Sequence, residues 1–286
     1  MNEHMERVRT HIDKMPSLSV TVAKVVEVCN RPGTSPIDLN KVISVDPVLM
    51  ARVLKLINSA YYGLSGKVTS LARAIIMLGI NTVKNLALST AIVGNLGSGE
   101  HFNALHMQGF WRHSLGVGVT AKLIAKKRGV DSKLLEEFFI AGLLHDIGKI
   151  PLNNVLSDTY VEILAAADRE REPLDVVENR VLGFTHCDVG AMIAKTWNLG
   201  GAISDAILFH HRPDEYTGDS SDLVHSTNVA NYFLNICEIG FSGDRFPGGA
   251  TDASLTAIGV TLDSLDAMED EVRAEISKAE VFLNPT

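Results

Sequence analysis

The residues best suited to chemistry are six histidines between positions 113 and 225, and the central one is followed directly by an aspartate. The pair His145-Asp146 ends a dense apolar run, and Lys149 and Pro151 come shortly after it. Burying an ionised aspartate costs free energy unless a positive charge compensates it. Imidazole and carboxylate together are suitable ligands for Fe, Mn and Zn. A core histidine beside a capping aspartate is the alternative for this stretch taken alone.

The other histidines favour the metal interpretation. A single histidine on a helix is more often a core or surface residue than a ligand, but several at helix ends around one His-Asp pair are hard to satisfy by hydrogen bonds alone. We therefore predict one or two divalent transition metals, drawn from Fe, Mn, Ni and Zn. The predicted metal ligands are His113, His145, Asp146, His186, His210 and His211. For His225 a solvated or helix-start position is expected instead.

These side chains must be positioned by helices, because apolar residues recur at helical spacing throughout and strand-like alternation is absent. Asp46-Pro47 is a strong helix start, and Asn81 is expected to cap the helix that follows it. The predicted helices include Ser19–Cys29, Val48–Asn58, Ser70–Leu78, Thr82–Val93, Phe110–Arg128, Glu136–Lys149, Asp158–Arg171, Pro173–Leu182, Asp188–Trp197, Ala202–His210 and Asp222–Ile239. The sequence thus predicts an all-α fold.

Composition limits the classes of function. The 286 residues carry 26 basic and 34 acidic side chains, a net charge of −8, which argues against a general nucleic-acid surface. No apolar run reaches the roughly 18 residues of a membrane span. The polar N-terminus is no secretory signal. Three cysteines, Cys29, Cys187 and Cys237, show no CxxC spacing and are expected to be reduced thiols in a cytoplasmic protein.

Two sets of motifs resemble known families. The order of His113, His145-Asp146, His186 and His210-His211 resembles the HD superfamily of metal-dependent phosphohydrolases, especially its HD-GYP branch. The N-terminal segments PSLSVTVAKVVEV, ISVDPVLMARVLKLINSAYYG and SLARAIIMLGINTVKNLAL resemble the HDOD domain, a bacterial signalling relative. This likeness runs from about Met15 to about Ile239. It implies an HD-domain-like helical bundle with an additional N-terminal helical subdomain and a regulatory role in bacterial signal transduction.

The predicted organisation follows from these motifs. A lead-in of residues 1–14 precedes an HDOD-specific helical subdomain of residues 15–100 and an HD-like metal-binding core of residues 101–240. Residues 241–286 are expected to form a C-terminal loop, Phe241–Thr251, and an amphipathic helix, Leu262–Leu283, which is expected to dock on the body, with a partner-binding helix as the alternative. The glycine-rich stretch Asn95–Glu100 is the predicted joint between the subdomains.

The chain departs from the enzyme pattern at two points. The resemblance implies that Lys149 contacts phosphate, and that Asp146 and Lys149 are the catalytic residues of an active member. However, Asn231 stands where a final metal-binding aspartate is expected, and no GYP motif follows His210-His211. Loss of a carboxylate leaves the metal charge less compensated, so weaker metal binding is expected.

Three functions remain open at this point. The first is a signalling module with a metal-binding HD core that acts through protein partners, for which Tyr61-Tyr62 is a candidate contact surface. The second is a metal-dependent phosphohydrolase or phosphodiesterase acting on a nucleotide or cyclic dinucleotide. The third is a metal-free scaffold, which the intact His145-Asp146 pair disfavours. Signalling proteins are the expected partners, a nucleotide or phosphate is a possible ligand, and neither nucleic acid nor a membrane is expected.

Overall fold

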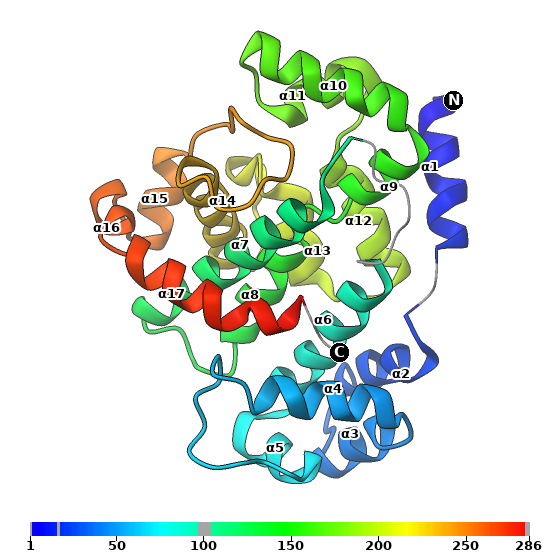
Figure 1. Ribbon diagram of the computed structural model, residues 1–286, viewed down its shortest axis with the longest axis vertical. Helices are drawn as coiled ribbons and strands as arrows, with labels where there is room; N and C mark the ends of the chain where they lie inside the picture. The colour runs from blue at the N-terminus through cyan, green and yellow to red at the C-terminus, as the bar shows by residue number, and fades with distance from the viewer. Residues whose placement is uncertain (1, 16–17, 97–103, 284–286) are drawn as a thin grey trace.

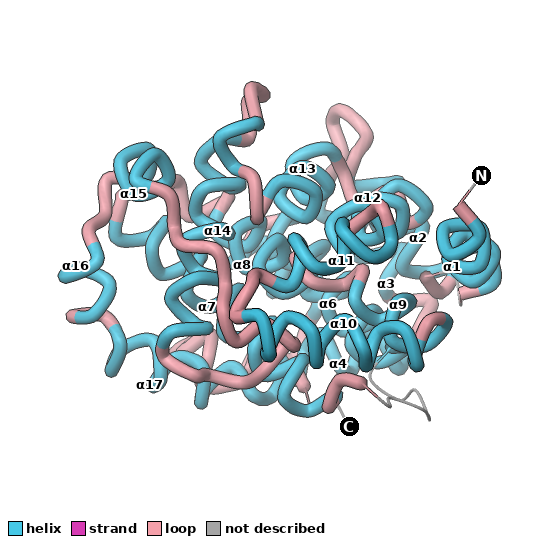
Figure 2. The backbone as a smooth tube through the Cα atoms, turned by 90° about the horizontal axis from the view of Figure 1, so that it is seen from above, coloured by secondary structure: helices cyan, strands magenta, loops and turns pink. Residues whose placement is uncertain are grey.

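Every regular element in the described part of the chain is a helix. The computed structural model describes residues 2–15, 18–96 and 104–283, and no strand occurs within these ranges (Figures 1 and 2). The all-α prediction is confirmed. Within the predicted joint Asn95–Glu100, residues 97–100 lie outside the described residues.

The N-terminal part is a group of short helices that pack around one longer helix, α6. α2, α3, α4 and α5 form the lower end of the molecule in Figure 1, and α6 lies between them and the central helix α8. α1 instead lies beside α9 and α12 and buries Val8 and Ile12. The bounds are α1 (Glu3–Lys14), α2 (Val20–Cys29), α3 (Pro36–Ile43), α4 (Pro47–Ile57), α5 (Leu71–Leu78) and α6 (Ile80–Leu96).

Local capping explains where these helices begin. The Asp46 carboxylate accepts a hydrogen bond from the Leu49 amide at 2.9 Å, and Pro47 occupies the first helical position. Such a cap contributes about 1 kcal/mol. The prediction that Asn81 caps α6 is wrong, because α6 begins at Ile80. Gly79, with a φ of +88°, makes the break between α5 and α6, so the new helix starts immediately after it.

The second part is built around the antiparallel neighbours α7 and α8, with α14 packed against both. α12 packs on α13 and α9, and α13 packs on α14 and α8, so several helix ends meet near the end of α8. The bounds are α7 (Met107–Lys127), α8 (Leu135–Leu144), α9 (Lys149–Val155), α10 (Ser157–Glu170), α11 (Leu174–Leu182), α12 (His186–Thr196), α13 (Gly201–Phe209) and α14 (Ser221–Ile236).

The predicted helix Glu136–Lys149 is too long. α8 ends at Leu144, a turn of four residues follows, and Lys149 begins a new helix, α9. Backbone bonds from Ile147 to Leu144 and from Lys149 to Asp146 close this turn with the shorter i to i+3 spacing. Pro151 does not end the helix, because it lies in the first turn of α9, where its missing N–H is not required.

The C-terminal segment packs along the body, although it is not one helix. The expected helix Leu262–Leu283 is divided into α16 (Leu262–Asp266), α17 (Glu269–Ala279) and the 3-10 turn η2 (Glu280–Phe282). It is preceded by α15 (Asp252–Ile258), which was not expected, and a further 3-10 turn, η1 (Pro213–Glu215), follows α13. α17 packs on α7, and the Phe282 ring lies against Phe139 and Tyr61. The expected docking of this tail is confirmed, and it ties the N-terminal helices to the centre.

No single helix within residues 2–15, 18–96 and 104–283 is both long and apolar enough to cross a membrane. α5 and most of α6 reach the required length and composition only when taken together, and the two are bent by 118° relative to each other.

Two glycines allow α7 and α8 to come into backbone contact. A Cβ on Gly142 would lie 2.6 Å from the Cα and the backbone nitrogen of Gly118. A Cβ on Gly118 would lie 2.5 Å from the carbonyl oxygen of Phe139. The obstructing atoms belong to the backbone and cannot rotate away. The position of the end of α8, and of His145-Asp146 after it, therefore depends on these glycines.

We expect Gly142→Ala to lower the free energy of unfolding by about 1–3 kcal/mol, because an added methyl group must push α7 and α8 apart. Chemical denaturation measures the change. Gly201→Ala in the first turn of α13 is the matched control, since no atom lies within 4 Å of the added Cβ and stability should be unchanged or slightly higher. Equal stability of both variants would contradict the close packing of α7 on α8.

Candidate metal centre

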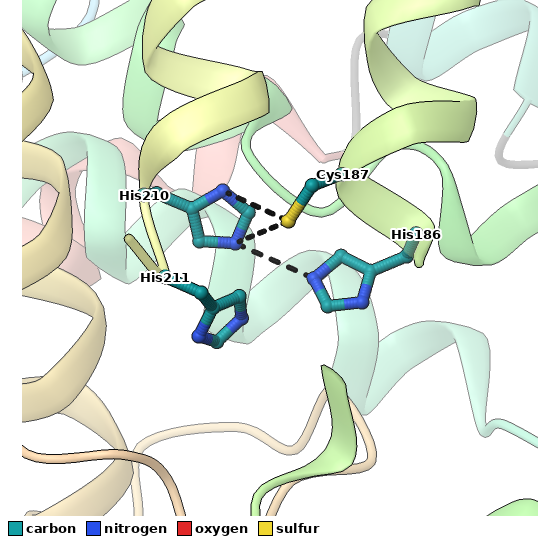
Figure 3. A group of neighbouring side chains, drawn as sticks. All are labelled: His186, Cys187, His210 and His211. Carbon is teal, nitrogen blue, oxygen red and sulfur yellow. Dashed lines mark hydrogen bonds between the residues drawn. The ribbon is translucent and has the colours of Figure 1, made fainter. Parts of the chain in front are cut away.

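The predicted ligands come together at the ends of several helices. His145 and Asp146 lie in the turn between α8 and α9, and His186 is the first residue of α12. His210 and His211 directly follow α13, opposite the start of α12 (Figure 3). His113 comes from α7. The side chains of His145, Asp146, His186 and His210 are completely buried, and His113 is 1% exposed. His186 belongs to α12, although the sequence placed it just before that helix.

A further glycine makes this meeting of helix ends possible. A Cβ on Gly148 would collide with the carbonyl oxygen of His186 and would lie 2.5 Å from the backbone nitrogen of Gly190. The turn that carries Asp146 therefore touches the backbone of α12. Gly148 thus has a structural role in bringing His186 to Asp146.

Hydrogen bonds fix the tautomers of three histidines. Nδ1 of His145 lies 2.7 Å from the Gly142 carbonyl oxygen, and Nδ1 of His210 lies 2.8 Å from that of Ile207. Nδ1 of His186 lies 2.6 Å from a carboxylate oxygen of Glu178. Since these oxygens only accept hydrogen bonds, each Nδ1 carries the proton and donates it. In the neutral ring Nε2 is left with a lone pair, which is the arrangement of metal-ligating histidines with a carbonyl or carboxylate behind them.

The three lone pairs converge on the two oxygens of Asp146. Nε2 of His186 is 3.2 Å and Nε2 of His210 is 3.7 Å from Oδ1, and Nε2 of His145 is 3.2 Å from Oδ2. Nε2 of His186 and Nε2 of His210 are 3.4 Å apart. Two imidazole nitrogens on one tetrahedral ion lie about 3.3–3.4 Å apart, given bonds of about 2.0–2.1 Å. Facing acceptors repel one another unless a proton or a metal ion lies between them.

Unpartnered polar atoms give an independent indication that the residues fit a metal ion. Four buried atoms around this cluster have no hydrogen-bond partner. Each such atom costs about 1–3 kcal/mol if it stays unsatisfied. Cations held by the two neighbouring donor groups, one containing His113, His145 and Asp146 and the other containing His186, Cys187, His210 and His211, would satisfy them. They are Nε2 of His145, Oδ1 of Asp146, Nδ1 of His113 and Nε2 of His211.

The ionisation of the cluster also suits a cation. Burial favours protonation of Asp146, but His145 and Lys149 outweigh it and hold the carboxyl pKa well below its usual value. Burial lowers the pKa of His113 to about 3, so this ring is neutral. For His186 the effect of burial is overcome by Glu178, and its pKa is raised. Asp146 is therefore anionic, and the surroundings of His186 favour a positive charge on or beside its ring. Both features are favourable for binding a metal ion.

Asn231 lies inside the site. Its Oδ1 accepts hydrogen bonds from Nε2 of His113 and from Nδ2 of Asn235, both at 2.9 Å. The proton on Nε2 leaves the lone pair of His113 on Nδ1. Asn231 therefore orients His113, as a carboxylate at this position would, but it adds no negative charge.

Lys149 is the positive charge of the site. Its Nζ donates to Oδ2 of Asp146 at 2.8 Å and to Oγ of Ser242 at 3.3 Å, and the side chain is 2% exposed. Burial would lower the Lys149 pKa, but Asp146 and Asp244 raise it. The ammonium is thus held beside Asp146 by charge, and its role as a phosphate contact stays a prediction.

Several residues of the site were not expected from the sequence. Glu178 on α11 binds both Nδ1 and the amide of His186 and accepts a hydrogen bond from the Tyr160 hydroxyl at 2.8 Å. Cys187 lies next to His186 in the cluster, and Asp244 is a buried carboxyl whose pKa is raised to about 6 by burial against the opposing effect of Lys149. Of these three residues, only Cys187 could have been found from the sequence, because it is adjacent to His186. Glu178 and Asp244 join the site through contacts between segments that are distant in the sequence.

His225 is buried within α14, so the expected solvated or helix-start position is wrong. Its Nδ1 pairs with Oγ of Ser254 at 2.9 Å. Tyr61 and Tyr62 are half-buried, with the Tyr61 ring against Phe139 and the Lys122 ammonium 4.6 Å from its centre. The tyrosine pair therefore contributes to packing between the N-terminal helices and the core.

The profile of the HDOD domain matches residues 15–213, which is most of the chain. The chain belongs to the HDOD family. An HDOD domain protein of unknown function from Geobacter sulfurreducens has a similar structure, with a TM-score of 0.76, 26% identity, and coverage of 96% of this chain and 98% of that one.

Two further relatives extend the comparison. A candidate metal-dependent phosphohydrolase from Shewanella amazonensis SB2B has the same fold, with a TM-score of 0.62, 19% identity, and coverage of 97% and 99% of the two chains. An uncharacterized protein from Treponema pallidum (strain Nichols) is 25% identical over 231 residues. That match covers 79% of this chain but only 43% of the relative, so this HDOD chain corresponds to less than half of that protein.

We expect the HDOD protein to bind less transition metal per chain when His145 is replaced by alanine. The substitution removes one donor facing Asp146 and leaves a buried charge less compensated. Elemental analysis of protein purified without a metal-chelating tag measures metal per chain. His106→Ala, at an exposed histidine before α7, should retain the wild-type content. Chelation should lower the Tm of the wild type and of His106→Ala, because metal binding stabilises the folded state. Equal, near-zero metal in all three proteins would contradict the site.

We expect Asn231→Asp to tighten metal binding. Asp has nearly the same shape as Asn and can keep the hydrogen bond from His113, while it adds a carboxylate next to the cluster. Titration of metal into the metal-free proteins compares their affinities. Asn198→Asp, at an exposed residue after α12, adds the same charge to the surface and should leave the affinity unchanged. If all three affinities agree, Asn231 plays no part in holding the metal.

Proposed function

We propose that this HDOD protein is a cytoplasmic bacterial signal-transduction module whose HD-type core binds a divalent transition metal and which acts through protein partners. Membership of the HDOD family and the fit of the His/Asp cluster to a metal support this function. Free thiols at all three cysteines agree with a reducing compartment.

The observation that carries the proposal is the burial of the metal centre. The side chains of His145, Asp146, His186 and His210 have no exposed surface. The loop after α14 closes over Lys149 with Ser242, which is 1% exposed, and with Asp244, which is 3% exposed. A substrate phosphate would reach this cluster only after that loop moved. A buried ion that joins the ends of α8, α12 and α13 is better suited to stabilising one arrangement of helices than to turnover.

The partner surface we propose is a groove where α5 faces α7 and α17. It has a volume of about 650 Å³ and is lined by Tyr62, Ile76, Met77 and Lys122, among others. Ile76 is 74% exposed and Met77 is 46% exposed, although both are large apolar residues. Exposed apolar side chains beside a groove are typical of protein-binding sites. The groove lies against the N-terminal helices that distinguish HDOD proteins. A partner protein bound there would contact these helices and would respond to a change in their arrangement.

A metal-dependent phosphohydrolase acting on a nucleotide or cyclic dinucleotide is the second candidate. The specific observation in its favour is the Lys149 ammonium, which lies beside Asp146 and can pair with a phosphate oxygen if the Ser242 loop opens. A divalent ion would supply Lewis-acid chemistry when bound. Turnover of bis(p-nitrophenyl) phosphate by the metal-loaded protein, lost in Lys149→Met, would favour the enzyme. Absence of turnover would favour the module.

We expect Ile76→Glu to abolish capture of partner proteins that bind the wild type. A charge placed at the centre of an apolar contact costs about 2 kcal/mol or more, which is roughly 30-fold in affinity. The HDOD protein is immobilised, and the proteins retained from an extract of its source bacterium are compared between wild type and variant.

Val161→Glu on α10 is the matched control. Val161 is 43% exposed, and α10 lies at the opposite end of the molecule from α5 (Figure 1). This variant should retain every partner. Retention of the same proteins by Ile76→Glu would exclude the groove as the partner surface.

A further inference from the structure

Four neighbouring side chains, His186, Cys187, His210 and His211, form one group of possible metal ligands. Cys187 is the one member of this group that the sequence did not predict as a ligand. It follows His186 at the start of α12, and its side chain points toward the ring of His210 (Figure 3). Its Sγ lies 3.8 Å from Nδ1 and 3.9 Å from Nε2 of that ring. One donor atom from each of His186, Cys187, His210 and His211 lies within 4.8 Å of the other three.

The Cys187 thiol has no good hydrogen-bond acceptor in this position. The Nδ1–H of His210 is donated to the Ile207 carbonyl oxygen, so only Nε2 can accept, and 3.9 Å is a long contact. Cys187 is 3% exposed. A buried thiol usually behaves as a small apolar group, but here it faces imidazoles.

His211 provides an independent indication of a ligand at the same place. Its side chain is 9% exposed, it belongs to the same four-residue cluster, and its Nε2 has no hydrogen-bond partner. Nδ1 of His211 lies 3.9 Å from Asp175 Oδ1. The unpartnered nitrogen and the thiol are both donors that a metal ion would use.

We infer that Cys187 Sγ is a metal ligand in the half of the centre that contains His186 and His210, and that this half takes a thiolate-binding ion such as Zn²⁺ or Fe²⁺. The inference rests on the metal core of the proposed function and specifies the ion. A tetrahedral ion with one thiolate and one imidazole holds the sulfur and nitrogen about 3.5 Å apart. A small rotation of the Cys187 side chain shortens 3.9 Å to that value.

The thiolate also changes the charge of the centre. On binding, the S–H bond breaks, the proton leaves to solvent, and the sulfur electron pair forms the bond to the metal. One negative charge is thereby added to a cluster in which Asn231 stands at an expected carboxylate position. Soft sulfur donors favour Zn²⁺ and Fe²⁺ over Mn²⁺. Cys187 thus adds its charge to the group of His186, His210 and His211, whereas Asn231 contacts His113 in the other group. Its sulfur determines which ion is preferred.

Cobalt spectroscopy of the full chain tests this assignment. The chain has 3 cysteines, so the double variant Cys29→Ser/Cys237→Ser retains Cys187 as its sole thiol. Both replaced cysteines are half-buried and lie outside the cluster. Metal-free protein is loaded with Co²⁺. We expect the visible bands of bound cobalt together with a near-ultraviolet sulfur-to-cobalt charge-transfer band, in the wild type and in the double variant alike.

The Cys187→Ser variant should bind Co²⁺ without the charge-transfer band. Its affinity for Zn²⁺ should fall by more than the roughly 10- to 100-fold that loss of an outer-shell partner costs, with a smaller change for Mn²⁺. If Cys187→Ser does not fold, the charge-transfer band of cobalt bound to Cys29→Ser/Cys237→Ser is the deciding measurement. Cobalt bound there without a charge-transfer band would overturn the assignment of Cys187 and leave the metal core standing. Failure of the wild type to bind cobalt at all would overturn both.

Discussion

The ionised carboxylate of Asp146 is the constraint on which the rest of the centre depends. It is completely buried, and a lone carboxylate at such depth would take up a proton rather than stay charged. Its pKa is nevertheless held low, because His145 and the Lys149 ammonium outweigh the effect of burial. Each helix end that reaches Asp146 brings a donor or a charge. The end of α8, the start of α9, the start of α12 and the end of α13 therefore have to meet at one point.

That meeting explains the close backbone contacts in this half of the molecule. Gly118 and Gly142 let α7 and α8 touch, and Gly148 lets the turn after α8 touch α12. A helix end is a suitable place for such contacts, since the side chain of a terminal residue can leave the helix axis and its ring can bond a nearby carbonyl. His145 and His210 both do so, with Gly142 and Ile207. The same local geometry that ends each helix also fixes the histidine tautomer.

How far the sequence predicts this structure depends on the range of the contact involved. Caps such as Asp46 and the apolar spacing of α2, α4 and α5 are local, and these three helices were predicted to within about two residues. The end of α8 was missed because the apolar pattern continues through Ile147 and hides the turn. The His145-Asp146 pair and the order of the histidines around it identified the cluster. Glu178 and Asp244 could not be predicted, because only the packing of α11 and the loop after α14 brings them to His186 and Lys149.

The two oxygens of Asp146 divide the centre into unequal halves. Oδ1 faces Nε2 of His186 and Nε2 of His210, with Glu178 behind His186. Oδ2 faces Nε2 of His145 but is also bonded by the Lys149 ammonium at 2.8 Å.

The Oδ2 half is the one that also contains His113 and Asn231, where a carboxylate is absent. An ion entering it must compete with Lys149 for the same oxygen and finds one negative charge fewer. An ion in the Oδ1 half would meet no ammonium, and Glu178 would hold the Nδ1 proton of His186. We therefore expect a first ion to bind between Asp146, His186 and His210. Asn231, which stands at an expected carboxylate position, contacts His113 in the Oδ2 half, so the donors of the Oδ1 half do not depend on it.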